Sequence, residues 1–215
     1  MLLRHGRTTH NVDGRIQGQL DIPLDRVGHE QARVVAQVLA ACTPYAVLSS
    51  DLVRARDTAE PVALACGVPL QLDSRLRELD LGRWQGLTSG EALEQFPDEY
   101  EAWRTGVDVA RGGGETYEQA GARAAQCVLE VDLPADGTLV AVTHGGTGRA
   151  LLGTLLGLPA GTSWRLAALG NTCWSVLVEA DRGWRLERHN ASPGPLVGAP
   201  EGAQDLGSVP ADVTL

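Results

Sequence analysis

The sequence predicts an α/β fold, a three-layer sandwich in which helices flank both faces of a mostly parallel central sheet. Short apolar runs alternate along the chain with segments whose apolar residues recur at helical spacing, and this alternation is typical of such sandwiches. The length of 215 residues suits a single domain with a sizeable core. We therefore expect ligands to bind at the edge of the sheet where the parallel strands end.

The expected strands are short and apolar, and polar or Gly-rich segments bound them. We place them at residues 1–3, 45–49, 70–72, 139–142, 174–178 and 184–187. A Gly-rich, polar loop over residues 5–24 follows the first strand. A turn at residues 180–183 joins the last two strands.

Helices are expected from apolar periodicity and from capping residues. Residues 32–39 repeat apolar side chains at helical spacing, and Asp25 is placed to cap that helix. The remaining helices are expected after Asp51 (to about residue 66), after the capping boxes that begin at Thr88 and Thr116, and over residues 149–156.

Composition excludes several classes of protein. The net charge is −9, whereas nonspecific nucleic-acid binders present a basic face. No apolar run approaches the ~20 residues that span a membrane, and the first residues lack the sections of a secretory signal. We therefore expect a cytoplasmic protein whose partner is a small molecule. The chain contains no lysine, so any anion site must use guanidinium or imidazole groups.

Two features are expected to take no part in the chemistry. The four cysteines form no Cys-x-x-Cys pair, and we interpret them as reduced, mostly buried thiols. Proline, glycine, alanine and acidic residues dominate from about residue 193, so residues 193–215 are expected to form a disordered tail after a domain over residues 1–192.

The strongest chemical signal is Arg4-His5-Gly6, directly after the first expected strand. An imidazole beside an arginine suits a nucleophile that faces an anion, and the glycine lets the backbone approach a ligand closely. A lone histidine is more often structural. Here Arg54 and His144 also follow expected strands, so we expect all of these side chains to meet at one edge of the sheet.

The ordered motifs resemble the histidine phosphatase (phosphoglycerate mutase-like) superfamily. The first motif is Leu-Arg-His-Gly-x-Thr at residues 3–8, with Asn11 six residues after His5. The other matching segments are residues 49–59, 76–86, 113–115 and 143–146. The resemblance covers roughly residues 2–192 in the family's order and spacing, and it implies a phosphatase on an α/β sandwich.

The resemblance implies a reaction through a phosphohistidine, with neither metal nor other cofactor. His5 would be the nucleophile, and Arg4, Arg54 and His144 would donate to the phosphoryl oxygens. Glu78 would protonate the leaving oxygen.

Glu78 also has a simpler interpretation, as a surface carboxylate paired with Arg75 or Arg77. The Gly-x-Trp-Gln-Gly segment at residues 82–86 favours the catalytic interpretation. His10 matches no catalytic position of the family, so we expect a surface or supporting role for it. By position in the family's loops, the expected substrate-binding residues are Asn11, Thr8, Gln17, Gly18 and Gly145.

Two alternatives remain open, a cofactor-dependent phosphoglycerate mutase and an inactive binding module on the same fold. The mutases carry Glu-Arg-His-Tyr-Gly around their acid, where this chain has Arg-Glu-Leu-Asp-Leu-Gly at residues 77–82. An inactive module is disfavoured because both histidines and both arginines are present. Four further segments resemble actinobacterial phosphatases that act on glucosyl-3-phosphoglycerate, namely residues 11–21, 81–88, 170–174 and 184–192. This resemblance implies a sugar-phosphate or phosphoglycerate-type substrate and a homodimer.

Overall fold

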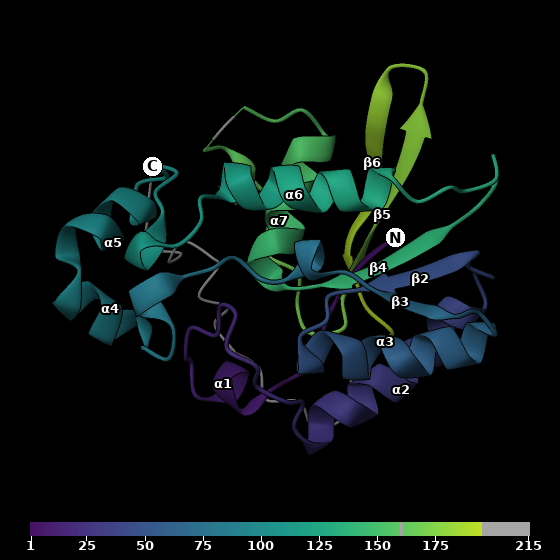
Figure 1. Ribbon diagram of the computed structural model, residues 1–215, viewed down its shortest axis with the longest axis horizontal. Coiled ribbons are helices and arrows are strands. Elements are labelled where there is room, and N and C mark those ends of the chain that lie inside the picture. The colour runs from purple at the N-terminus through teal and green to yellow at the C-terminus, as the bar shows by residue number, and fades with distance from the viewer. Residues whose placement is uncertain (160, 195–215) are drawn as a thin grey trace.

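A computed structural model describes residues 1–159 and 161–194, so the tail predicted over residues 193–215 lies almost entirely outside the described residues. One six-stranded sheet forms the centre, in the order β3-β2-β4-β1-β5-β6 (Figure 1). Its strands are β1 (Leu2–Arg4), β2 (Ala46–Ser49), β3 (Leu70–Leu72), β4 (Leu139–Thr143), β5 (Trp174–Ala180) and β6 (Gly183–Ala191). The first four strands run parallel to one another, β5 runs antiparallel to β1, and β6 runs antiparallel to β5. The predicted mostly parallel sheet is therefore confirmed.

Helices cover both faces of the sheet. The pair α2 (Arg26–Ala40) and α3 (Val53–Cys66) lies on one face, and α6 (Tyr117–Leu129) and α7 (Gly145–Leu155) lie on the other (Figure 1). Three shorter helices, α1 (Thr9–Val12), α4 (Ser89–Gln95) and α5 (Pro97–Arg104), lie beside this sandwich. The predicted three-layer arrangement is therefore correct.

The pleat of the strands explains the two cores. Neighbouring residues of a strand point to opposite faces, so Leu3 packs with Val35 and Ala59 on the α2–α3 side, while Leu2 packs with Ala124 and Leu152 on the α6–α7 side. A third apolar cluster forms beneath α4 and α5 and includes Trp84, Tyr100 and Trp103. This third cluster forms one end of the cavity described below.

The predicted caps are mostly confirmed. The Asp25 carboxylate accepts the N–H of Gly28 at 2.7 Å, and Thr88 and Thr116 each form a complete capping box. The expected cap at Asp51 is wrong. Leu52 occupies the N-cap of α3 with no side-chain hydrogen bond, because the Asp51 carboxylate accepts two hydrogen bonds from Arg77 at 2.7 and 2.6 Å.

Three further expectations need correction. The loop predicted over residues 5–24 contains the short helix α1, whose N-cap is Thr8. Helix α7 begins at Gly145 rather than at residue 149, because the two glycines after His144 adopt helical geometry. The cysteines are free, but only Cys127 is buried and Cys42 is exposed, so burial was predicted too widely.

Candidate active site

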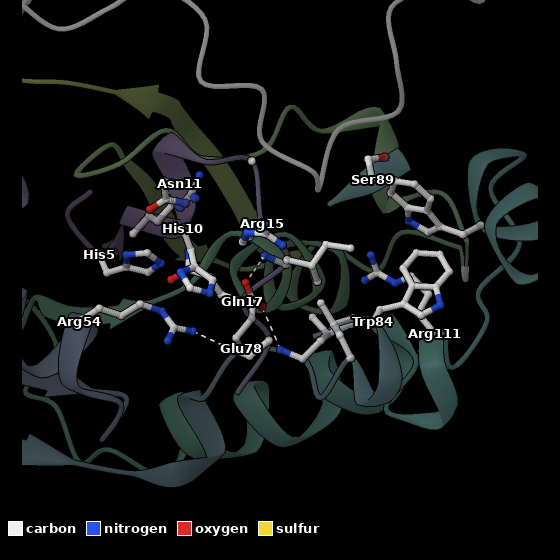
Figure 2. Close-up of a pocket in the computed structure, with 18 of the residues that line it drawn as sticks. His5, His10, Asn11, Arg15, Gln17, Arg54, Glu78, Trp84, Ser89 and Arg111 are labelled. Carbon is white, nitrogen blue, oxygen red and sulfur yellow. Dashed lines mark hydrogen bonds between the residues drawn. The ribbon is translucent and has the colours of Figure 1, made fainter. Parts of the chain in front are cut away.

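The carboxyl edge of the sheet brings together the predicted catalytic side chains. Arg4 ends β1 and His5 follows it, Arg54 lies in the first turn of α3 after β2, and His144 follows β4 as the N-cap of α7. Glu78 comes from the loop after β3. A cavity opens over this edge (Figure 2). Of the predicted site residues, those that line it are Arg4, His5, Asn11, Gln17, Gly18, Arg54 and Glu78.

The His5 ring is held in one orientation. Its Nδ1 lies 2.7 Å from the carbonyl oxygen of Gly6. A carbonyl oxygen can only accept, so Nδ1 carries a proton and Nε2 keeps its lone pair in the neutral ring. Burial, together with the charges of Arg54 and Arg4, holds the pKa of His5 well below its usual range. The ring is therefore neutral near pH 7, with Nε2 as the available nucleophile.

His144 is fully buried and lies outside the cavity lining, with its ring centroid 5.1 Å from that of His5. Arg54 donates its Nε–H to His144 Nδ1 at 3.1 Å, and His144 Nε2 lies 2.9 Å from Ser50 Oγ. Burial, followed by the charges of Arg54, His5 and Arg4, lowers the pKa of His144 well below its usual range. Sequence patterns gave no role to Ser50, whose hydroxyl forms the hydrogen bond with the second ring nitrogen of His144.

Arg54 is fully buried and hydrogen-bonds to the loop that precedes α2. Its Nη1 donates to the carbonyl of Leu20 at 2.6 Å and its Nη2 to that of Gly18 at 2.7 Å. Burial lowers the pKa of Arg54 to about 10, so the guanidinium remains charged at neutral pH. This explains the place of Gly18, which presents its carbonyl to Arg54 and reaches the cavity wall.

The Glu78 carboxylate caps α7 rather than pairing with a neighbouring arginine. Oε1 accepts the N–H groups of Thr147 at 2.7 Å and Leu79 at 2.9 Å, and Oε2 accepts the N–H of Gly146 at 3.0 Å. The arginines that could have paired with it bind other carboxylates, Arg77 to Asp51 and Arg75 to Asp73. The simpler interpretation of Glu78 is therefore wrong.

The loop after His5 is organised by Thr8. Its hydroxyl lies 3.1 Å from Asn11 Oδ1 and 3.0 Å from Gln17 Oε1, and Asn171 donates its Nδ2–H to the same Asn11 oxygen at 3.2 Å. Asn11 and Gln17 line the cavity, whereas Thr8 is fully buried and lies outside the lining. Gly145 is also buried and outside it, and its neighbour Gly146 takes the lining position.

Several lining residues were not predicted. His10 borders the cavity, although sequence patterns assigned it to the surface or to a supporting role. Arg15 and Arg111 also line it, together with the aromatic side chains of Trp84, Tyr100 and Trp103. Trp84 belongs to the Gly-x-Trp-Gln-Gly segment and Arg15 to the segment over residues 11–21, but no pattern predicts that they meet the others. Only the fold brings these distant segments together.

Neither a metal cluster nor a membrane helix is found in the described parts of the chain. Across residues 1–159 and 161–194, no three His, Cys, Asp or Glu side chains gather closely enough to hold a metal ion. The same residues contain no helix with the length and apolar character needed to cross a bilayer.

Residues 1–192 match the family described as the histidine phosphatase superfamily (branch 1). The chain belongs to this superfamily. The predicted family, fold and enzyme class, a histidine phosphatase, are therefore confirmed.

Similar proteins of known name match most of the chain. It is 40% identical to the glucosyl-3-phosphoglycerate phosphatase of Mycolicibacterium vanbaalenii, over 89% of this chain and 94% of the relative. A solved structure of mycobacterial glucosyl-3-phosphoglycerate phosphatase complexed with VO3 is 40% identical and has a TM-score of 0.83, covering 89% of this chain and 98% of that one. The probable phosphoglycerate mutase GpmB of Salmonella choleraesuis is 37% identical, over 77% of this chain and 78% of the relative.

Proposed function

We propose that this histidine phosphatase hydrolyses a phosphoglycerate that carries a sugar, and that the phosphoryl group passes through His5. The observation that carries the proposal is the hydrogen bond between His5 Nδ1 and Gly6 O at 2.7 Å. It leaves Nε2 as the ring's free lone pair, in a cavity that Arg4, Arg54 and Glu78 also line. A neutral, oriented imidazole among cations suits attack on a phosphate dianion.

In the first step the Nε2 lone pair forms a bond to phosphorus while the bond from phosphorus to the ester oxygen breaks. The guanidinium groups of Arg4 and Arg54 offset charge on the phosphoryl oxygens. Glu78 gives its proton to the departing oxygen, so that the product leaves as an alcohol. Oε1 of Glu78 accepts two backbone N–H groups whereas Oε2 accepts one, so Oε2 is the oxygen with room for that proton.

In the second step water attacks the phosphohistidine. The Glu78 carboxylate takes a proton from the water, a P–O bond forms, and the N–P bond breaks to return the lone pair to His5. Phosphate then leaves and both groups are restored. His144 supports both steps by keeping Arg54 in place through the hydrogen bond at 3.1 Å. The two steps use no metal ion.

The substrate is inferred from the relatives and from the polar wall of the cavity. The similar mycobacterial proteins are named for glucosyl-3-phosphoglycerate. Asn11 and Gln17 line the cavity and offer amide groups suited to a phosphate oxygen and to sugar hydroxyls. Thr8 and Gly145 do not line it, so we assign Thr8 to positioning Asn11 and Gln17 rather than to contact with the substrate.

The setting of the enzyme follows from the same reasoning. We propose that it acts in the cytoplasm on a small phosphate ester, without nucleic acid, and that it forms a homodimer like the subfamily it resembles. The net charge of −9 supports the exclusion of nucleic acid.

The test is a substrate panel in excess chelator. Phosphate release is measured for glucosyl-3-phosphoglycerate, 3-phosphoglycerate, hexose phosphates and nitrophenyl phosphate. We expect the highest kcat/KM for glucosyl-3-phosphoglycerate, unchanged by the chelator. Gln17→Ala should lower that value roughly ten- to hundredfold, because a buried partner of a substrate hydroxyl contributes about 1–3 kcal/mol, and it should spare nitrophenyl phosphate.

Two results would reject parts of the proposal. Equal or faster turnover of 3-phosphoglycerate or of a plain hexose phosphate would reject the sugar-bearing substrate. Loss of all activity in chelator, restored by a divalent ion, would reject the metal-free reaction. The control variant is Gln126→Ala, whose side chain donates to Glu130 on the exposed face of α6 at 2.9 Å.

A further inference from the structure

Arg111 is a buried arginine at the far end of the same cavity. It begins the 3-10 turn η3 (Arg111–Gly113), and its side chain lines the cavity while only 4% of the residue is exposed. Figure 2 shows it beside Trp84, at the opposite end of the lining from His5 and Arg54. The phosphate site described above therefore leaves Arg111 without a role.

The side chain is held by aromatic rings and by no acid. Its guanidinium carbon lies 5.3 Å from the ring centroid of Trp103 and 5.0 Å from that of Tyr117. Across the described residues no carboxylate forms an ion pair with Arg111, and its buried Nε has no hydrogen-bond partner. Arg15, the other unpredicted arginine of the lining, pairs with Glu91 at 3.3 Å. Arg111 thus differs from Arg15 in lacking a counter-ion.

A buried cation without a counter-ion is costly, because burial removes its hydration and nothing replaces the lost hydrogen bonds. Rings on the faces of a guanidinium stabilise the charge but leave its N–H edge free for an acceptor in the same plane. An arrangement of this kind is stabilised when an oxyanion enters the cavity.

The turn that carries Arg111 is fixed against the loop after β3. The N–H of Gly112 donates to Glu99 Oε2 at 2.8 Å, and Gly112 has a positive φ of 63°. A Cβ at Gly112 would lie 2.6 Å from the backbone nitrogen of Arg83, so the two loops meet too closely for a side chain there. Arg111 therefore starts from a rigid backbone, as a binding residue requires.

We propose that Arg111 binds a second anionic group of the substrate, the carboxylate, while Arg4 and Arg54 hold the phosphate that is transferred. The proposal rests on the proposed function, since it adds a carboxylate site to that same cavity. A carboxylate offers two acceptors in one plane, which the guanidinium edge matches. Arg111 would then select phosphate esters that also carry a carboxylate.

Calorimetric titration of a variant that does not turn over substrate tests this directly. In His5→Ala, we compare 3-phosphoglycerate with glycerol 3-phosphate, which keeps the phosphate and lacks the carboxylate. We expect 3-phosphoglycerate to bind roughly ten- to hundredfold more tightly, the range for hydrogen bonds to a charged group. Adding Arg111→Met, which keeps the packing against both rings, should abolish this preference and leave the affinity for glycerol 3-phosphate within about threefold.

Folding and charge are controlled separately. Arg104→Gln in the same background removes one exposed cation, paired with Glu101 at 2.8 Å, and should keep the preference. Because Arg111→Met removes an uncompensated buried charge, its melting temperature should equal or exceed that of the parent. Arg111→Lys keeps the cation and should retain part of the preference, which provides a second variant should the first fail to fold.

Two outcomes would overturn the carboxylate site. One is the absence of a carboxylate preference in His5→Ala itself, and the other is a preference that survives in folded Arg111→Met. The proposed function fails by other measurements, namely the substrate panel and the labelling of His5. The binding of 3-phosphoglycerate and glycerol 3-phosphate therefore tests the carboxylate site whatever the substrate panel and the labelling of His5 show.

Discussion

Arg54 donates its Nε–H to Nδ1 of His144 across 3.1 Å. An arginine can only donate, so this contact makes Nδ1 the acceptor and leaves the proton of the neutral ring on Nε2, 2.9 Å from Ser50 Oγ. Burial, with the charge of Arg54 as the next cause, lowers the pKa of His144. Arg54 therefore sets the tautomer of His144 in addition to supplying charge to the cavity.

Arg54→Lys should lower kcat/KM at least hundredfold although it keeps the positive charge. A single ammonium cannot reach the acceptors that Arg54 contacts together, on His144, Leu20 and Gly18, and each hydrogen bond to a charged group contributes about 1.5–3 kcal/mol. Phosphate release from nitrophenyl phosphate measures the loss. Arg56→Lys, on the same helix and paired with Asp57, is the control and should match the parent. Activity of Arg54→Lys within a few-fold of the parent would show that charge alone suffices.

Glu78→Gln should slow alkyl phosphates far more than nitrophenyl phosphate. Nitrophenolate leaves readily without a proton, whereas an alkoxide needs the acid, whose contribution is typically ~10²–10⁴-fold. The measurement is the ratio of the two kcat values in the variant and in the parent. The same loss for both substrates would make Glu78 a structural residue that caps α7.

Gly146→Ala should impair the same step without touching the carboxyl group. A Cβ at residue 146 would lie 2.8 Å from Glu78 Oε1 and 2.8 Å from Leu79 Cδ1, so the carboxylate must shift. We expect the loss on alkyl phosphates to exceed the loss on nitrophenyl phosphate, as for Glu78→Gln.

The matched control for that variant is Gly90→Ala. Gly90 lies within α4, and an added Cβ there meets nothing within 4 Å. Replacement of a helical glycine by alanine should raise stability by roughly 0.5–1 kcal/mol and leave activity unchanged. Full activity in Gly146→Ala would mean that Glu78 tolerates displacement and that its position is not critical.

The stability of the protein should fall as the pH drops below about 6.5, partly because of its two buried imidazoles. The folded pKa values of His5 and His144 lie below the unfolded value, so the unfolded chain binds more protons in that range and stability decreases with falling pH. Each histidine contributes up to about 1.4 kcal/mol per pH unit. Urea unfolding of the parent and of His5→Gln between pH 7 and pH 5 measures the slopes, and the variant should be less steep. Identical slopes would contradict a neutral, buried His5.

Sequence patterns predicted most of the catalytic end of the cavity. Arg4 ends a buried strand, and His5, Arg54 and His144 follow buried strands. They lie where expected because the ends of parallel strands meet at one edge. Glu78 joins them through a loop whose course the sequence does not reveal. Its partners lie in the first turn of α7, which begins at Gly145, four residues before the predicted start of that helix.

The other end of the cavity could not be predicted. Arg111, Trp103 and Tyr117 come together through tertiary packing, and none of them belongs to a recognisable motif. The prediction that Asp51 caps α3 was wrong for a similar reason. Arg77, which is distant in sequence, binds the Asp51 carboxylate. Local patterns cannot report a partner that only the fold supplies.

The phosphohistidine mechanism depends most on His5 as the residue that carries the phosphoryl group. The most direct test of this role is to mix the enzyme with ³²P-labelled nitrophenyl phosphate, quench the reaction rapidly without acid, and map the labelled peptide. We expect label that is lost in acid, survives in base, maps to His5, and is absent from His5→Ala. Label on a serine, on an acidic residue or on His10, or full turnover by His5→Ala, would contradict the phosphohistidine mechanism.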